Sequence, residues 1–353
     1  MTSKTPKSSK PSPEPSPEPS LKTAAKTSAA SLPAKPQAGI LGELPDLGRY
    51  LFFTLGTQDN AKAAKTNLVA ALTALRDVAD GKAAVVGIGL SVGSALNVTV
   101  PGLRGFPSLT TVKTAAQPAL KLPADTTALW CWLRSAKGED QGHLLHRSRH
   151  IEAALAPAFK LTHVVDGFCH ARSLDVKDGG RGRDLTGYED GTENPKGKAA
   201  RTATVVAGQG EGLDGSSFVA VQQWLHDWQA INSMAQHTKD ASIGRRQSDN
   251  EELEDAPASA HIKRTTQEDF NPEAFVTRRS MPWVQGQKGG LLFVAFGRTL
   301  DAFEVQMRRM AGLDDGIVDA VFSMSKPVNG AYFWCPPLQG KRLDLRQLGI
   351  TPC

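Results

Sequence analysis

The stretch that decides the fold is LLFVAFGRTLDAFEVQMRRM, which covers residues 291–310. Its first part, Leu291–Phe296, is a short apolar run of the kind that forms a buried strand. Its second part, Ala302–Met310, places apolar residues three or four positions apart, which is the spacing of one face of a helix. The stretch therefore predicts a strand that is followed by a helix.

Strand and helix patterns of this kind recur along the body of the chain, in two halves with a similar rhythm. Because the strands in each half are few and several connections are long, we expect an α+β fold with antiparallel sheets that carry helices on one face. A split β-α-β arrangement used twice is the predicted architecture. The other predicted strands are Tyr50–Leu55, Ala84–Leu90, Ala128–Leu133, Leu161–Asp166, Ser217–Gln223 and Phe275–Met281, and the other predicted helices are Ala61–Val78, Gly142–Leu155 and Gly316–Met324.

Composition sets the predicted domain boundaries. Residues 1–37 are rich in Pro, Ser, Lys and Ala and contain the repeat PSPEPSPEPS, which favours an extended polyproline-like conformation. Such a segment cannot bury enough apolar surface to offset its ordering entropy. We predict a disordered tail over 1–37, an N-terminal half over 38–180, a C-terminal half over 181–345 and a short tail over 346–353.

The net charge of +5 belongs mostly to the N-terminal tail. Residues 1–37 hold six lysines and two glutamates, a net charge of +4, which leaves +1 for the rest of the chain. A basic tail is typical of a solvated, disordered segment. Nucleic-acid binding is therefore not predicted.

No segment of the sequence predicts membrane insertion or export. The chain has no run of 18 or more apolar residues, and its first residues resemble neither a secretory signal nor a transit peptide. The cysteines are scattered without a CxxC spacing, which favours neither a zinc site nor a disulfide framework. We therefore expect a cytoplasmic protein in which Cys131, Cys169, Cys335 and Cys353 are reduced.

The segment GYEDGTENP, residues 187–195, is a candidate ligand-facing loop. Its two glycines and its proline indicate irregular structure, and glycine lets a backbone approach a ligand closely. Between them stand three carboxylates, Glu189, Asp190 and Glu193. Because many ordinary turns contain Gly-x-x-Asp-Gly, the spacing alone leaves both a functional loop and a plain turn open.

Three histidines, His143, His146 and His150, share one face of a predicted helix and could bind a metal. No carboxylate or further histidine completes a ligand set, however, and Arg147 and Arg149 would repel a cation. A solvated helix face is therefore the favoured interpretation.

Two other sites carry residues suited to chemistry. His261 follows an acidic run and precedes a basic pair, and this context sets it apart from the remaining histidines. In TRRSMPW, residues 277–283, the adjacent Arg278 and Arg279 of a predicted strand point to opposite faces. One of the two could enter a pocket and stabilise a developing oxyanion, or the segment could be a charged edge strand.

Taken together, these motifs resemble the dye-decolourising peroxidase family, and most closely its bacterial branch of short cytoplasmic enzymes. The similarity extends from about residue 38 to about residue 340 and is densest after residue 187. The motifs that carry it, in order, are GYEDGTENP, IGRRQSDNEELEDAPASAHIKRT, VTRRSMPW, LLFVAFGRTLDAFEVQMRRMAG and YFWCPPL.

The resemblance implies a fold and an activity. The fold would be two ferredoxin-like halves that form a dimeric α+β barrel-like domain pair. The activity would be that of a haem b peroxidase, which reduces hydrogen peroxide and oxidises a dye, a phenol or another one-electron donor via a ferryl intermediate. A homo-oligomer, a dimer or larger, is also implied.

The resemblance assigns catalytic roles by position. Asp190 would be the acid–base residue on the peroxide side of the haem, because a carboxylate can move the proton from one peroxide oxygen to the other. Arg278 would stabilise negative charge on the departing oxygen, which leaves Arg279 on the other face of the strand. Ser280 matches a polar position that is asparagine in many relatives, so its role is less clearly implied.

The resemblance also assigns the residues that hold the haem. His261 would be the axial ligand of the iron, and Asp319 would accept the other ring N–H of that histidine and strengthen its donation. Arg245 and Arg278 would also contact the cofactor, with Arg245 directed at a propionate.

Two alternative functions stay open from the sequence. A haem-handling protein, for storage, delivery or iron release, would use the same His261 and show only incidental peroxidase turnover. A haem-free structural protein of the same fold is the second alternative. Within the second half, electrons could leave through an aromatic residue, although packing is the simpler role for each of Trp224, Trp228, Trp283, Trp334, Tyr188 and Tyr332.

Overall fold

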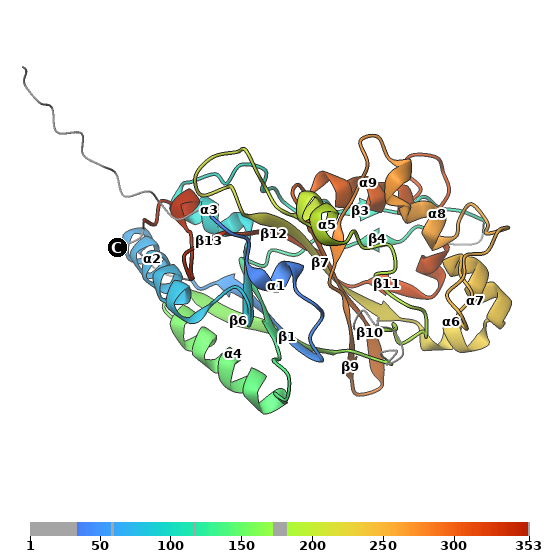
Figure 1. The fold of residues 1–353 in the computed structure, drawn as a ribbon, viewed down its shortest axis with the longest axis horizontal. Helices are drawn as coiled ribbons and strands as arrows, with labels where there is room; N and C mark the ends of the chain where they lie inside the picture. The colour runs from blue at the N-terminus through green and yellow to red at the C-terminus, as the bar shows by residue number, and fades with distance from the viewer. Residues whose placement is uncertain (1–33, 58–59, 116–117, 172–181, 352–353) are drawn as a thin grey trace, which may run out of the picture. The chain divides into compact units, whose positions relative to one another are not determined.

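The computed structural model describes residues 34–57, 60–115, 118–171 and 182–351, and residues 33–353 form one compact unit (Figure 1). The predicted N-terminal tail therefore lies almost entirely outside the described residues, as does the predicted boundary between the halves at residue 180. Before that boundary the elements are α1 Ala38–Leu41, β1 Leu47–Leu55, α2 Ala61–Val78, β2 Ala84–Ile88, α3 Leu90–Leu96, β3 Leu109–Thr110, β4 Lys121–Leu122, β5 Leu129–Arg134, α4 Gln141–Leu155 and β6 Phe159–Phe168.

The second half contains more short elements than the first. After β7 Ser217–His226, several helices and turns precede the next long strands, β9 Met281–Gln285 and β10 Lys288–Gly297. The remaining elements are α5 Gly197–Thr204, α6 Trp228–Ser233, α7 Gln236–Ile243, α8 His261–Thr265, η1 Gln267–Asp269, β8 Thr277–Arg278, α9 Asp301–Met310, η2 Ala320–Ser323, β11 Ser325–Pro327, β12 Ala331–Cys335, β13 Leu338–Gln339, β14 Arg342–Leu343 and η3 Arg346–Leu348.

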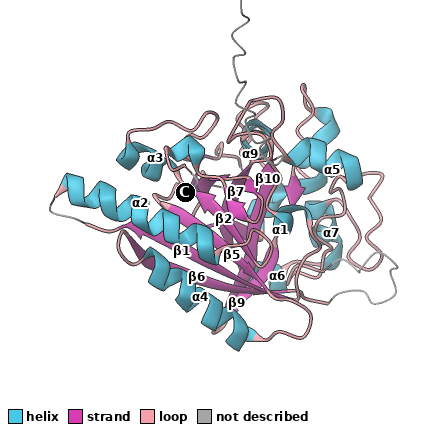
Figure 2. Ribbon diagram, turned by 60° about the vertical axis from the view of Figure 1, so that its left-hand side comes forward, coloured by secondary structure: helices cyan, strands magenta, loops and turns pink. Residues whose placement is uncertain are grey.

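Each half is built on the same split β-α-β plan. The first sheet has the order β2-β5-β1-β6, with every pair antiparallel, and α2 and α4 lie side by side against it (Figures 1 and 2). The second sheet has the order β12-β7-β10-β9, again antiparallel, with α9 between β10 and β12 in the chain. These are the strand orders of a ferredoxin-like unit.

The two sheets close on each other into a ring. One seam joins β12 to β2 through the single pair Trp334 and Ile88, and the other joins β6 to β9 through the single pair Gly167 and Trp283. Closure leaves these eight strands without free edges. The expected fold of two ferredoxin-like halves is thus confirmed.

Alternation along the strands separates two cores. On β5, Trp130 and Trp132 face the interior of the ring, whereas Leu129, Cys131 and Leu133 pack outward against the helices. This follows from the two-residue period of a strand. The interior is filled by large side chains, in which Tyr50 stacks between Trp130 and Trp132 and Phe296 and Phe333 complete the packing.

Most predicted elements are present, and two predictions were wrong. Phe275–Met281 is not a continuous strand, because the chain breaks between β8 and β9 and Ser280 accepts a hydrogen bond from Val294 N–H. Gly316–Met324 is not an α-helix: Asp319 caps a short 3-10 turn over Ala320–Ser323. The strand β12, whose five residues are all buried, was not predicted.

Part of each predicted tail belongs to the folded body. Lys35 pairs with Leu338 as a β-bridge, and the buried Gln37 side chain donates to Val86 O and accepts from Val86 N–H. At the other end, Leu348 and Ile350 are buried in the outer core. Residues 35–37 and 346–350 are therefore packed rather than free, because their apolar or amide groups find partners there.

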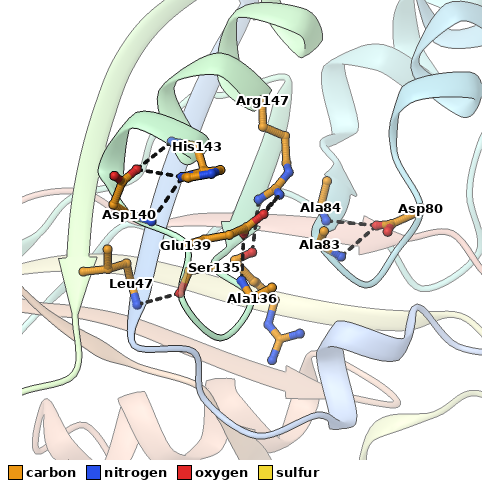
Figure 3. Close-up of polar contacts among 11 residues, drawn as sticks. Leu47, Asp80, Ala83, Ala84, Ser135, Ala136, Glu139, Asp140, His143 and Arg147 are labelled. Carbon is orange, nitrogen blue, oxygen red and sulfur yellow. Dashed lines mark hydrogen bonds and ion pairs between the residues drawn. The ribbon is translucent and has the colours of Figure 1, made fainter.

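His143 has a structural partner at the start of α4, shown in Figure 3. Asp140 caps the helix by accepting from His143 N–H at 3.1 Å, and the His143 ring accepts from Asp140 N–H at 3.3 Å. This reciprocal arrangement satisfies two helix-end donors. Among the described residues, no group of three His, Cys, Asp or Glu could hold a metal ion.

Within the described ranges, no helix combines the length and the apolar character that a membrane crossing requires.

Candidate active site

A cavity of about 460 Å³ lies on the outer face of the second sheet, between β7, β8, β10, α8, α9 and the loop that follows residue 183. Four of the predicted site residues line it: Asp190, Arg245, His261 and Arg278. Much of the remaining wall is apolar, and this part is formed by Val276, Leu291, Phe293, Phe303, Met307 and Met310.

His261 opens helix α8 and is fixed by a buried carboxylate. Its Nδ1 lies 2.8 Å from Oδ2 of Asp319, whose side chain is fully buried. The other oxygen, Oδ1, accepts from Val321 N–H at 2.9 Å, so the carboxylate is held on both sides. An Nδ1–H that donates to Asp319 leaves the lone pair on Nε2, and no described residue forms a hydrogen bond with that nitrogen.

Asp190 sits in a turn that glycine makes possible. Gly187 and Gly191 have φ values of +91° and +77°, in the left-handed region that other residues rarely adopt. Before the turn, Arg183 and Glu189 form an antiparallel bridge, which makes residues 182–190 a short hairpin. A side chain at Gly187 would meet Gln247, because its Cβ would lie 2.5 Å from Nε2.

Arg278 and Asp190 form a long ion pair. Nη1 of Arg278 lies 3.8 Å from Oδ1 of Asp190, which is beyond hydrogen-bonding distance. Both side chains are partly exposed, at 20% and 24%.

Arg279 faces away from this cavity, as the alternation of a strand predicts. Its guanidinium donates to the carbonyl oxygens of Ile40 and Leu41 near the end of α1. Burial, together with the nearby positive charge of Arg134, lowers the pKa of Arg279 to about 10.

Arg245 lines the cavity beside carboxylates. Its Nη2 lies 2.8 Å from Glu193 and 3.5 Å from Glu252, and its Nη1 donates to Asn250 O. Both glutamates are about half exposed. An anionic ligand group could therefore replace the glutamates with little rearrangement.

Ser280 is not brought together with the other predicted residues. It lines a separate small cavity of about 20 Å³, which Asp190 borders as well. Its hydroxyl accepts from Val294 N–H, so the side chain is engaged with the neighbouring strand. The walls of the two cavities share Asp184, Asp190 and Leu291, but Ser280 itself does not line the larger one.

The structure adds a buried pair that sequence reasoning missed, Asp184 and His226. His226 Nε2 lies 2.9 Å from Asp184 Oδ1, and its Nδ1 lies 2.9 Å from the Ser325 hydroxyl. Burial alone would raise the pKa of Asp184, but hydrogen bonds from His226 and Thr186 hold it below its usual value. No local pattern could reveal this pair, because the partners are 42 residues apart.

Tyr188 is a second residue on the cavity wall with an unexpected partner. Its hydroxyl donates to Asp240 Oδ1 at 2.5 Å, and burial together with that carboxylate raises its pKa well above the usual value. Gln222 also lines the cavity, and its buried Nε2 has no hydrogen-bond partner among the described residues.

The cavity lies in the part of the chain that is similar to known proteins. The family model for the C-terminal region of Dyp-type peroxidases matches residues 181–340, which contain every residue described above as lining the cavity. The dye-decolorizing peroxidase of Mycobacterium tuberculosis is 34% identical over 162 residues, which are 44% of this chain and 48% of that protein. Residues 181–340 therefore resemble the C-terminal region of Dyp-type peroxidases. The chain spans about half the length of this mycobacterial relative.

Other dye-decolorizing peroxidases are similar over a longer part of the chain. The dye-decolorizing peroxidase of Rhodococcus erythropolis is 29% identical over 320 residues, covering 87% of this chain and 88% of that protein. A haem-bound variant of DypB from Rhodococcus jostii RHA1 is 25% identical, with a TM-score of 0.70 and coverage of 85% and 96%. A dye-decolorizing protein of V. cholerae, at 23% identity, has the same fold, with a TM-score of 0.69 and coverage of 89% and 99%.

Proposed function

We propose that this chain is a haem peroxidase that reduces hydrogen peroxide and oxidises dyes, phenols or other small one-electron donors. One observation carries the proposal: an aspartate and an arginine, Asp190 and Arg278, lie 3.8 Å apart in the cavity that His261 also lines. The similarity of residues 181–340 to Dyp-type peroxidases and the haem in the Rhodococcus jostii structure support it.

The residues of the cavity fit a haem. His261 offers a neutral Nε2 backed by the Asp319 carboxylate, which is the arrangement that orients and strengthens an axial imidazole ligand. The apolar wall suits the faces of a flat macrocycle. Arg245 would hold a propionate in place of the exposed Glu193.

A bound haem would supply the electrons that reduce peroxide, and a donor would return them one at a time. The Asp190 carboxylate would take the proton from one peroxide oxygen and return it to the other, so that water can leave. Arg278 would stabilise the negative charge that develops on the departing oxygen. Because the two groups are 3.8 Å apart, one oxygen atom beside the pair could lie within hydrogen-bonding distance of both.

A haem-handling role for storage, delivery or iron release would need His261 but would give Asp190 and Arg278 no task. The pair therefore distinguishes the two functions. Stopped-flow spectroscopy of Asp190→Asn and Arg278→Leu with peroxide tests the proposal. Removal of a group that stabilises a transition-state charge costs about 10²–10³-fold in rate, so we expect haem-replete variants that react slowly. Unchanged rates in both variants would defeat the proposal.

We also propose that the protein is a cytoplasmic homo-oligomer. Cys131 and Cys335 are buried thiols outside any disulfide, as a reducing cytoplasm requires. Light scattering after size-exclusion chromatography would test for the proposed homo-oligomer, and a monomer at micromolar concentration would contradict it.

A further inference from the structure

The side chain of Asn194 connects the Asp190 loop to the backbone of Arg278. Its Oδ1 accepts from Arg278 N–H at 2.7 Å, and its Nδ2 donates to Arg278 O at 2.9 Å. The two residues are 84 positions apart in the chain. One amide therefore satisfies both backbone groups of the arginine, as a neighbouring strand would.

The position of β8 in the sheet explains why these backbone groups are available. β8 is the last strand beyond β10, so one of its edges has no neighbouring strand. The residue after Arg278 makes a backbone hydrogen bond to β10: Arg279 N–H donates to Val294 O at 2.7 Å. The backbone of Arg278 faces Asn194 instead, and Asn194 completes the edge.

The loop is shaped to bring this amide to the strand. Gly191 has a φ of +77°, and a Cβ placed there would lie 2.8 Å from Nδ2 of Asn194. Glu193, which precedes Asn194, is also held in place: its backbone carbonyl accepts from Gln267 Nε2 at 2.9 Å. Gln267 Oε1 accepts in turn from Val276 N–H, close to β8.

The long ion pair requires some such restraint. Charge-assisted hydrogen bonds between a guanidinium and a carboxylate are usually about 2.7–2.9 Å long, whereas Arg278 and Asp190 stand 3.8 Å apart. No direct bond therefore sets their separation. Two partly exposed side chains of opposite charge could close up or drift apart unless their backbones were fixed relative to each other.

We propose that Asn194 is a positioning residue that fixes Asp190 relative to Arg278, so that both groups can act on the same peroxide. This rests on the proposed peroxidase function. Asn194 acts through the backbone and does not itself line the cavity. Because a misplacement of about 1 Å can cost about 10²-fold in rate, we expect its loss to slow the peroxide reaction without releasing haem.

The test compares haem-loaded Asn194→Ala and Asn194→Asp with a matched control, Gln247→Ala. Gln247 holds the start of the same loop through Thr186 O, at a distance of 2.6 Å, and does not line the cavity. We expect a fall of about 10²-fold in the rate constant with peroxide for Asn194→Ala and weaker cyanide binding. For Asn194→Asp, which keeps the acceptor but loses the donor, we expect a smaller fall, and for Gln247→Ala we expect no more than a few-fold change.

A second readout does not depend on turnover. In the haem-free protein, hydrogen exchange at Arg278 N–H should accelerate in Asn194→Ala and stay unchanged in Gln247→Ala. The proposal would be overturned if Asn194→Ala exchanges faster but its rate constant with peroxide stays within about three-fold of wild type. It would also be overturned if Gln247→Ala loses as much of that rate as Asn194→Ala. If Asn194→Ala does not load haem, Asn194→Asp is judged by the same criteria. A wild-type protein that does not react with peroxide would defeat the proposed function instead.

Discussion

Nδ1 of His261 lies 2.8 Å from Oδ2 of Asp319, a carboxylate that the fold buries completely and holds through Val321 N–H. When Nδ1–H donates to Asp319, the lone pair of the histidine is on Nε2. This relationship links the 3-10 turn η2 to helix α8 and defines one side of the cavity.

Asp319→Asn should weaken donation from His261. Loss of a carboxylate that hydrogen-bonds to a metal-bound histidine typically costs about 10–100-fold in metal affinity or activity, so we expect lower haem affinity and a more positive reduction potential. Spectroelectrochemical titration measures both. Asp315→Asn is the matched control, because Asp315 pairs with Arg264 and not with His261. An unchanged potential in Asp319→Asn would rule out this role.

Arg278 and Arg279 should show opposite phenotypes although they are neighbours. Arg279→Met removes hydrogen bonds to Ile40 O and Leu41 O, and we expect it to cost about 1–3 kcal/mol of stability with little change in the peroxide rate. Arg278→Leu should lower the rate constant with peroxide and leave the free energy of unfolding unchanged. Urea unfolding and stopped-flow kinetics on both variants check this, and a rate loss confined to Arg279→Met would reverse the assignment.

The Asp184–His226 pair predicts an acid-dependent loss of stability. The folded pKa of Asp184 is below its unfolded value, so the pair stabilises the fold above about pH 3.9 and loses that effect as pH falls through the folded pKa. We expect Asp184→Asn to cost about 1–3 kcal/mol near pH 7 and less near pH 3. Burial raises the pKa of Asp166, so Asp166→Asn should show the opposite trend in the same urea titrations. A cost of Asp184→Asn that did not change with pH would contradict this account.

Tyr188 is the tyrosine best placed to carry a radical after peroxide treatment. It lines the cavity, and Asp240 can accept its phenolic proton when the ring is oxidised. Tyr188→Phe should therefore remove or shift a tyrosyl signal in electron spin resonance. Tyr50→Phe is the control, because the Tyr50 hydroxyl is buried without a hydrogen-bond partner among the described residues. A signal that survives Tyr188→Phe unchanged would exclude this residue.

Local patterns were sufficient for much of the fold. The helix Ala61–Val78 was predicted with its observed bounds from apolar positions at helical spacing. The structure adds that Asn60 caps its start. Strands at Tyr50–Leu55 and Ala128–Leu133 were likewise expected from apolar runs, and they correspond to β1 and β5, although their pairing was not predicted. The strand β12, whose five residues are all buried, was not predicted.

The candidate site, like the fold, was predicted only in part. Motif similarity pointed to Asp190, His261, Arg278 and Asp319, and the structure places the first three on one cavity and bonds the fourth to His261. Ser280 lies apart from that cavity. The roles of Asp184, His226 and Asn194 depend on partners 42 to 99 residues away in the chain, and no pattern in one sequence reveals such pairing.

The central claim is that this cavity holds a haem that reacts with peroxide, and an absorption spectrum of the purified protein, before and after hydrogen peroxide, tests it most directly. The account predicts a Soret band that is lost in His261→Ala and that changes on addition of one equivalent of peroxide. A wild-type protein purified from haem-supplied cells that shows no Soret band, or one that peroxide leaves unaltered, would contradict it.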